Sequence, residues 1–189
     1  TVESGYDRTN REIAKRVVTL LGAGEVDGSQ VSENAMDASD IRRTLSGDGV
    51  STIAYAESEQ IPASHGFLDS LRSNGNPDLD ETDAATKVNG LIRQAVQSRL
   101  TCPADIESAE RSLIVVSGPP DAISRKGIES ARQWLERTTG SVEVLSGDDP
   151  RPGTDSLSAV VLLSNVTDIH SVDRLQELAV DAKENIERQ

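Results

Sequence analysis

Two aspartates, Asp37 and Asp40, are the residues whose type and spacing could do chemistry. They lie three positions apart in the segment AMDASDI, at the predicted start of a short helix. Two carboxylates at one end of a helix can orient a water molecule or help to bind a cation. They can also be purely structural, with Asp37 as the N-cap and Asp40 complementing the helix dipole. Spacing alone favours this structural interpretation.

Other catalytic arrangements are not supported by the sequence. His65 and His170 have no motif around them, and Cys102 is expected to be a small buried apolar side chain. The sequence contains no paired His/Cys spacing, no EF-hand loop and no glycine-rich phosphate loop that opens a helix. Gly22 and Gly24 end a predicted helix, so they offer no free N–H groups to a phosphate. We therefore predict no metal site and no self-contained active site.

The charge pattern narrows the class of protein. The chain has a net charge of −13, which argues against nucleic-acid binding. Few lysines, many acidic residues and abundant Ser, Thr, Asp and Gly are typical of a cytoplasmic protein from an extreme halophile, because carboxylates keep a surface hydrated at high salt. At low salt we expect self-repulsion to unfold it. No apolar run reaches the roughly 18 residues of a membrane span.

The elements that must position these residues follow from hydrophobic periodicity and turn signals. A core helix is expected at 10–21, followed by a short helix in which Ile41 and Leu45 face inward. Residues 58–83 form a predicted acidic loop, and residues 171–188 a closing amphipathic helix. Further helices and strands are predicted at 50–57, 83–100, 111–118, 121–138, 141–146 and 157–166.

This order of elements predicts an α/β fold. It is a layer sandwich in which helices pack on a four-stranded mixed sheet, preceded by a core helix. The turn DDPRPG is short, so the last two strands are expected to pair as a hairpin. No disulfide framework is possible with one cysteine.

The order of segments resembles the second half of a tubulin/FtsZ-superfamily GTPase, closest to the archaeal FtsZ and CetZ branch. NREIAKRVVTLLGAGE is similar to the family's core helix. AMDASDIRRTLSGDGVSTIAYAE is similar to the loop, short helix and strand that follow it. ATKVNGLIRQAVQSRL, SLIVVSGPPDAIS, KGIESARQWLE, SVEVLSGDDP and LSAVVLLSNV then match the family's later elements in order.

The resemblance implies roles for individual residues. Asp37 and Asp40 would enter the nucleotide site of the next subunit in a head-to-tail protofilament and position the water that attacks GTP. Tyr6 would stack on guanine and Asn10 would hydrogen-bond its edge. GTP and Mg²⁺ would be held mainly by a phosphate-binding half preceding Thr1, so this chain alone is expected to be inactive.

The resemblance also implies a division of the chain. Residues 1–47 would hold the core helix and the intersubunit catalytic loop, and residues 48–189 a GTPase-activating domain. The function would be a polymer-forming GTPase in cell division or cell shape. Two departures from the family pattern, Ala35 and Ala38, leave open a catalytically degenerate scaffold or polymer cap. A stand-alone α/β binding domain also stays open.

Overall fold

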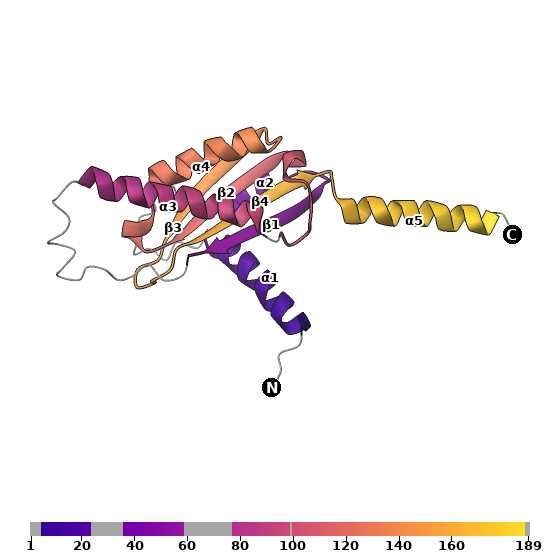
Figure 1. The fold of residues 1–189 in the computed structure, drawn as a ribbon, viewed down its shortest axis with the longest axis horizontal. Coiled ribbons are helices and arrows are strands. Elements are labelled where there is room, and N and C mark those ends of the chain that lie inside the picture. The colour runs from indigo at the N-terminus through magenta and orange to yellow at the C-terminus, as the bar shows by residue number, and fades with distance from the viewer. Residues whose placement is uncertain (1–4, 24–35, 59–76, 99, 188–189) are drawn as a thin grey trace.

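A mixed four-stranded sheet forms the centre of the molecule (Figure 1). The computed structural model describes residues 5–23, 36–58, 77–98 and 100–187. The strands are β1 (Val50–Glu57), β2 (Arg111–Gly118), β3 (Glu143–Pro150) and β4 (Ser158–Val166), in the spatial order β1-β4-β2-β3. β2 and β3 run parallel, whereas β4 is antiparallel to both β1 and β2. The predicted α/β fold with a mixed sheet is confirmed.

The predicted hairpin between the last two strands is wrong, because β2 lies between β3 and β4. β3 also continues past the predicted strand, since Asp148, Asp149 and Pro150 pair with the end of β2. The link at 151–157 is long enough to cross the roughly 10 Å that separates two non-adjacent strands. It is tied to the strand that it crosses, because Arg151 N donates to Gly118 O at 2.7 Å.

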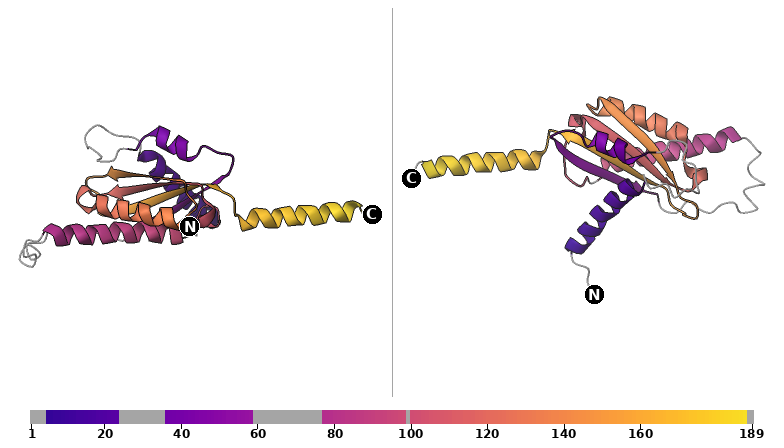
Figure 2. Two further views of the ribbon diagram at one scale, coloured as in Figure 1. Left: turned by 90° about the horizontal axis from the view of Figure 1, so that it is seen from above. Right: turned by 180° about the vertical axis from the view of Figure 1, so that it is seen from behind.

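Two long helices cover one face of the sheet (Figure 2). They are α3 (Pro77–Gln97) and α4 (Arg125–Thr138), and short 3-10 turns at Ile106–Ser108 and Pro120–Ala122 flank β2. We call the apolar cluster that they bury the large core. Its sheet residues are Ala54, Ala56, Ile114, Val116, Val144, Ala159, Val161, Leu163 and Val166, and its helix residues include Val88, Leu91, Ile92, Ala95, Val96, Ile128, Ala131 and Leu135.

The opposite face is covered by the C-terminal part of α1 (Gly5–Gly22) and by α2 (Ala38–Thr44). Strand residues alternate between the two faces, so the neighbours of the large-core residues point here. We call this second cluster the small core: Leu20, Ala23, Met36, Ile41, Leu113, Val115, Val160 and Leu162. Three apolar residues of α1, Ile13, Val18 and Leu21, are nevertheless exposed. Leu45, which was predicted to face inward, is exposed as well.

The last helix, α5 (His170–Glu187), extends away from the sheet (Figure 1). The terminal helix predicted at 171–188 is confirmed within one residue at each end. The apolar face of this amphipathic helix does not pack on the sheet. Its large apolar side chains, Val172, Leu175, Leu178, Val180 and Ile186, are all exposed. Over the described ranges, no helix is long and apolar enough to cross a membrane.

The predicted acidic loop at 58–83 is corrected at its C-terminal end. α3 begins at Pro77, a residue type favoured at the first turn of a helix. Residues 59–76 of that loop lie outside the described residues. Two other helix starts also differ from the prediction: α1 starts at Gly5 rather than at residue 10, and α4 starts at Arg125, after the N-cap Ser124, rather than at residue 121. The division between 1–47 and 48–189 stays a prediction.

Candidate functional site

Helix α2 carries both predicted acidic residues at its N-terminal end. Asp37 is the N-cap, and its Oδ1 accepts hydrogen bonds from Ser39 N at 2.6 Å and from Asp40 N at 3.1 Å. Asp40 reciprocates, since its Oδ2 accepts from Asp37 N at 3.1 Å. This capping box satisfies N–H groups that a helix start otherwise leaves unpaired. The structural interpretation of the two acids is thus confirmed, and a catalytic role must coexist with it.

The electrostatics of the cap keep Asp37 charged. Hydrogen bonds from the Ser39 hydroxyl, then from the Asp40 and Ser39 amides, hold the pKa of Asp37 below its usual value. The side chain is exposed, so its charge is available to a partner. At neutral pH this carboxylate therefore accepts hydrogen bonds and donates none.

The two carboxylates have unequal accepting capacity left. One oxygen of Asp37 is occupied by the amides of Ser39 and Asp40 and by the Ser39 hydroxyl. Asp40 uses one oxygen for a single amide. Within the described ranges, Asp37 Oδ2 and Asp40 Oδ1 accept no hydrogen bond. These two oxygens can accept hydrogen bonds from a water molecule or act as hard ligands to a divalent cation.

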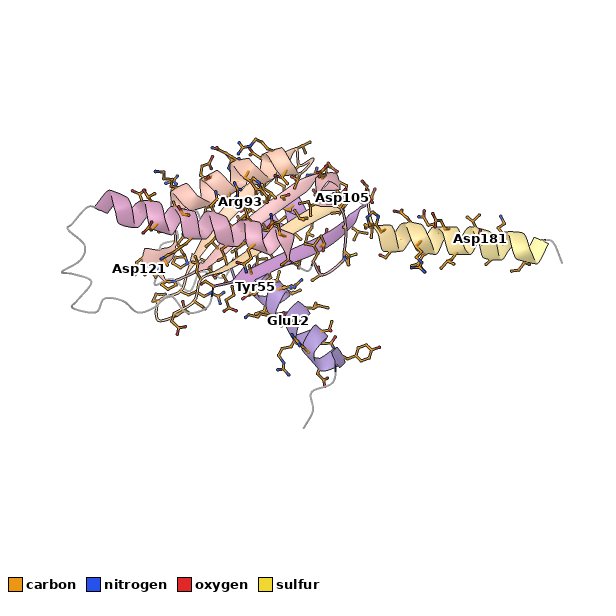
Figure 3. All side chains as sticks on the ribbon, in the orientation of Figure 1. Glu12, Tyr55, Arg93, Asp105, Asp121 and Asp181 are labelled. Carbon is orange, nitrogen blue, oxygen red and sulfur yellow. The ribbon has the colours of Figure 1, made fainter. Side chains whose placement is uncertain are left out.

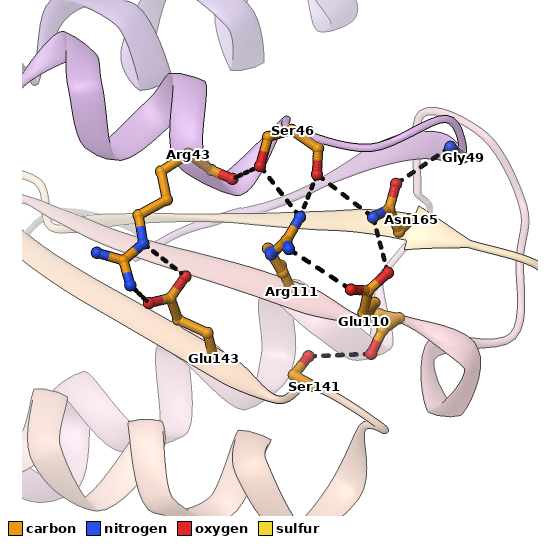
Figure 4. Close-up of polar contacts among 9 residues, drawn as sticks. Arg43, Ser46, Gly49, Glu110, Arg111, Ser141, Glu143 and Asn165 are labelled. Atoms are coloured by element: carbon orange, nitrogen blue, oxygen red, sulfur yellow. Dashed lines mark hydrogen bonds and ion pairs between the residues drawn. The ribbon is translucent and has the colours of Figure 1, made fainter.

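Apolar and polar contacts hold α2 on the sheet. Met36 and Ile41 are buried in the small core. Within the helix, the buried Thr44 hydroxyl donates to Asp40 O at 2.9 Å. Arg43 makes a two-pronged ion pair with Glu143 of β3, with Nε donating to Oε2 at 3.0 Å (Figure 4). A seven-residue helix is too short to be stable alone in water. Its position therefore depends on these contacts.

Tyr6 and Asn10 lie in the N-terminal half of α1. Both are exposed, and Tyr6 retains 84% of its accessible surface. The core helix was predicted to begin at Asn10, but α1 already begins at Gly5, so both residues lie on the helix. Residues four apart on a helix share one face, so the two side chains are neighbours.

The structure does not bring these two pairs together. Leu20 shares the small core with Ile41 of α2, whereas Tyr6 lies fourteen residues earlier on α1. At 1.5 Å per residue, this places Tyr6 roughly 21 Å from Leu20 along the helix axis. α1 runs away from the sheet over that length (Figure 1).

A charged cluster, which sequence patterns did not predict, fixes α1 to β1. Lys15 pairs with Glu57 and lies 5.0 Å from the centre of the Tyr55 ring, and Ser156 donates to Glu57 at 3.2 Å. Figure 3 shows Tyr55 at this junction and Glu12 further out along α1. The buried Arg16 adds a hydrogen bond from Nη1 to Ile53 O at 3.2 Å.

This cluster shifts three pKa values. The hydrogen bond to Glu57 raises the pKa of Lys15, and burial raises the pKa of Tyr55. Burial alone would raise the pKa of Glu57, but its hydrogen bonds and its charge interaction with Lys15 outweigh burial and lower it. The cluster therefore stays an ion pair across the neutral range. Two adjacent basic residues, Lys15 and Arg16, within an otherwise apolar stretch of the helix were the available signal.

Among the residues that the structure describes, one group of side chains could hold a metal ion. Asp168, His170 and Asp173 place one ligand atom each within 4.8 Å of one another at the start of α5. All three are exposed, and His170 Nδ1 already lies 3.5 Å from Asp168 Oδ1. Open, solvated groups of this kind are weak sites because no buried donor fixes their geometry. His65 and Ala35 lie outside the described residues, and Cys102 is half-buried against the large core.

Comparisons with known proteins agree on one family. The family model described as the tubulin-like CetZ C-terminal domain matches residues 1–181. Tubulin-like protein CetZ1 of Haloferax volcanii is 45% identical over 193 residues, which cover 99% of this chain and 49% of that protein. CetZ3 of the same organism is 44% identical over 188 residues, which cover 98% of this chain and 48% of that protein. The chain spans about half the length of the curated relatives it matches.

Solved structures give the same result. The GDP-bound monomer of Haloferax volcanii CetZ1 superposes with a TM-score of 0.75 at 38% identity, covering 97% of this chain and 47% of that one. CetZ2 of the same organism, in a GTPγS-bound protofilament, also gives a TM-score of 0.75, at 33% identity, covering 99% of this chain and 49% of that one.

Proposed function

The chain belongs to the CetZ family of tubulin-like proteins, matched as its C-terminal domain, and on this premise we propose that the intact protein is a cytoplasmic, polymer-forming GTPase of the cytoskeleton. In the polymer, α2 of one subunit supplies Asp37 and Asp40 to the GTP held by its neighbour. The 189 residues contain no phosphate-binding loop motif. The chain alone is therefore expected to hydrolyse no GTP.

The separation of the two predicted pairs is the observation that carries this proposal. Tyr6 lies roughly 21 Å, and Asn10 roughly 15 Å, along the α1 axis from Leu20 in the small core under α2. A nucleotide bound by Tyr6 and Asn10 is thus out of reach of the same chain's acids. Two subunits stacked head to tail bring one subunit's acids to the other's nucleotide. The relative CetZ2 forms a protofilament with GTPγS, which supports this arrangement.

The proposed chemistry needs only positioning and charge. Phosphoryl transfer to water requires a nucleophile held in line with the leaving group. Asp37 Oδ2 and Asp40 Oδ1 are free to accept the two hydrogens of one water molecule and so to orient its lone pair toward the γ-phosphate. Asp40 has the greater spare capacity, so we expect it to dominate.

The nucleotide contacts are proposed for Tyr6 and Asn10. An exposed phenol ring can stack on a guanine base, and an amide side chain can pair with the base edge. Mg²⁺ would neutralise phosphate charge when it is bound. The carboxylates of this chain are oxygen ligands of the kind that Mg²⁺ accepts.

The test is GTP turnover by the full-length gene product in molar KCl with Mg²⁺. The specific rate is expected to rise with protein concentration, because an isolated subunit lacks its neighbour's acids. Asp40→Asn keeps an oxygen that can accept from Asp37 N, and so spares the cap while it removes the charge. We expect it to lower turnover about a hundredfold or more with nucleotide affinity retained.

A matched control is Asp48→Asn, which removes an exposed acid just after α2. It is expected to leave turnover unchanged. Wild-type turnover in Asp40→Asn, or a specific rate independent of concentration, would contradict the proposal.

The capping box favours a second candidate, a scaffold that forms filaments without hydrolysis. Both carboxylates already have local partners in α2, and Ala38 is one of the departures from the family pattern. Filaments that form with GTP and release no phosphate would support this candidate over the first.

A further inference from the structure

Strand β4 contains a bulge directly beneath the end of α2. Between the pairs Val50↔Val166 and Thr52↔Leu163, two residues of β4 face one residue of β1. One of the two, Asn165, has φ of 54°, the one positive φ of a non-glycine residue within the described ranges. Asn is among the few residues that tolerate this left-handed conformation. A bulge of this kind re-aims a side chain and is over-represented beside active sites.

The re-aimed Asn165 side chain joins three separate segments (Figure 4). Its Oδ1 accepts from Gly49 N at 3.1 Å. Its Nδ2 donates to Ser46 O at 3.4 Å and to Glu110 Oε2 at 2.8 Å. Both hydrogens of the amide group are thereby used, and the residue is only 9% exposed. A buried amide with this many partners holds them in one arrangement.

The loop after α2 is shaped around this side chain. At Gly47, where φ is 150°, a Cβ atom would lie 2.1 Å from Asn165 Nδ2. At Gly49, a Cβ atom would lie 2.6 Å from Asn165 Cα. No other residue type fits either position without moving Asn165 or the loop. The segment that leaves α2 is therefore pressed against the bulge.

Glu110 and Arg111 extend the contact to the end of α2. Arg111 donates from Nη1 to Ser46 O and, at 3.1 Å, to Ser46 Oγ, while Ser46 Oγ donates to Arg43 O at 2.6 Å. Arg111 Nη2 lies 3.6 Å from Glu110 Oε1. One continuous set of hydrogen bonds thus runs from Asn165 to a carbonyl in the last turn of α2.

We propose that Asn165 is a positioning residue for GTP hydrolysis: its bulge fixes the C-terminal end of α2, and thereby the register in which Asp37 and Asp40 meet the neighbouring subunit. This inference rests on the proposed function of those acids. α2 is a rigid rod of under two turns between its two ends. A shift at Ser46 therefore moves the carboxylates as well, and small misplacements of catalytic groups are costly.

The deciding variant is Asn165→Gly in the full-length gene product. Glycine accepts the positive φ without strain, so the bulge survives while the amide is lost. We expect the maximal GTP turnover per polymerised subunit to fall about tenfold or more. Nucleotide affinity and the protein concentration needed for assembly should stay within about twofold of wild type.

Hydrogen exchange supplies a readout that does not depend on activity. In Asn165→Gly the amides of residues 41–46 should exchange faster, while those of β2 stay protected. Ser164→Ala is the matched control. It removes the neighbouring side chain of the same bulge, whose hydroxyl faces Ser51 at 2.9 Å rather than α2, and it should leave both exchange and turnover as in wild type.

A double variant separates this inference from the function on which it rests. If Asn165 acts through Asp40, Asn165→Gly adds no further loss to Asp40→Asn. Wild-type turnover in Asn165→Gly, beside a strong loss in Asp40→Asn, would overturn the positioning role alone. An equal fall in affinity, assembly and turnover would also overturn it, because it would indicate general destabilisation. An unaffected Asp40→Asn would overturn the proposed function itself.

Discussion

The two faces of the sheet are covered in different ways, although the same strands supply both. Leu163 points into the large core beneath α3 and α4, whereas its neighbour Leu162 points into the small core beneath α1 and α2. Both are almost fully buried. One face is covered by two long helices, and the other by a seven-residue helix and the end of α1.

This difference places most of the apolar packing on one face and the proposed catalytic acids on the other. α3 and α4 pack so closely that a Cβ atom on Gly127 would lie 2.6 Å from Ala85 O. α2 instead relies on two buried apolar residues, one ion pair and the Asn165 bulge. Regions with few buried contacts are the ones that open or move at low cost. The candidate catalytic residues thus lie on a helix that few contacts hold in place, so the loss of one contact is expected to move them.

The largest expected effect comes from the adjacent leucines. Leu163→Ala should cost about 3–4 kcal/mol in the free energy of unfolding, and Leu162→Ala about 2–3 kcal/mol, because the smaller cluster collapses more readily around a cavity. Leu162→Ala should in addition lower GTP turnover of the full-length protein, since it removes apolar packing beneath α2.

Urea unfolding followed by circular dichroism in molar KCl measures the two costs. Turnover is then compared at concentrations where both variants are folded. A larger loss of turnover in Leu163→Ala than in Leu162→Ala would contradict the division between the faces.

Two glycines test the same comparison at the backbone. Gly47→Ala should cost about 1–3 kcal/mol, because its φ of 150° and the contact with Asn165 both oppose a side chain. Gly90→Ala is the counterpart on α3, where nothing lies within 4 Å of an added Cβ. It should stabilise the protein by about 0.5–1 kcal/mol. Thermal unfolding would show opposite shifts in Tm, and equal shifts would refute the expected contrast.

The Lys15–Glu57 pair sets a pH dependence on the α1 side. The pKa of Glu57 is lowered from 4.5 and that of Lys15 is raised from 10.5. The stabilisation is therefore present between these two values. It is lost as the pH falls through the folded pKa of Glu57 or rises through that of Lys15. Glu57→Gln should cost about 0.5–1 kcal/mol at pH 7. Urea unfolding at pH 7 and pH 3 would show the difference from wild type shrinking in acid.

The smallest effect is expected on the surface of α4. Arg132 pairs with Glu129 and Glu136, and its hydrogen bonds lower the pKa of Glu129 from 4.5 to about 2. Exposed pairs of this type contribute about 0.2–0.5 kcal/mol. Glu129→Gln should cost no more than that above pH 4.5, and nothing below pH 2. A cost above 1 kcal/mol by urea unfolding would contradict this expectation, because it would show that the pair contributes more than an ordinary exposed ion pair does.

Sequence patterns predicted the elements better than their partners. The apolar runs of β2 and β4 and the N-cap at Asp37 were found because each depends on local residue types. The position of β3 in the sheet was not predicted, because a link as short as the one between β3 and β4 permits either a hairpin or a connection across one intervening strand. The exposed apolar face of α5 could not be predicted either, since periodicity reveals a face and not what covers it.

The candidate site divides in the same way. Asp37 and Asp40 were found through their spacing and their resemblance to a family. Asn165 was not, because an asparagine near the end of an apolar strand gives no local sign of a bulge or of partners at Ser46 and Glu110, which are 119 and 55 residues away. Contacts of such long range follow from sheet topology, which sequence periodicity does not contain.

The order of the strands also dictates an order of events during synthesis. Of the four strands, β1 is made first, yet its sheet partner is β4, which is made after the other three. β2 and β3 can pair earlier, while β1 must wait for a partner about a hundred residues away. Because β4 also carries Asn165, the acidic residues gain their final support only when this strand is inserted. A nascent chain thus contains the two acidic residues of α2 before it contains the strand that holds the end of that helix in place.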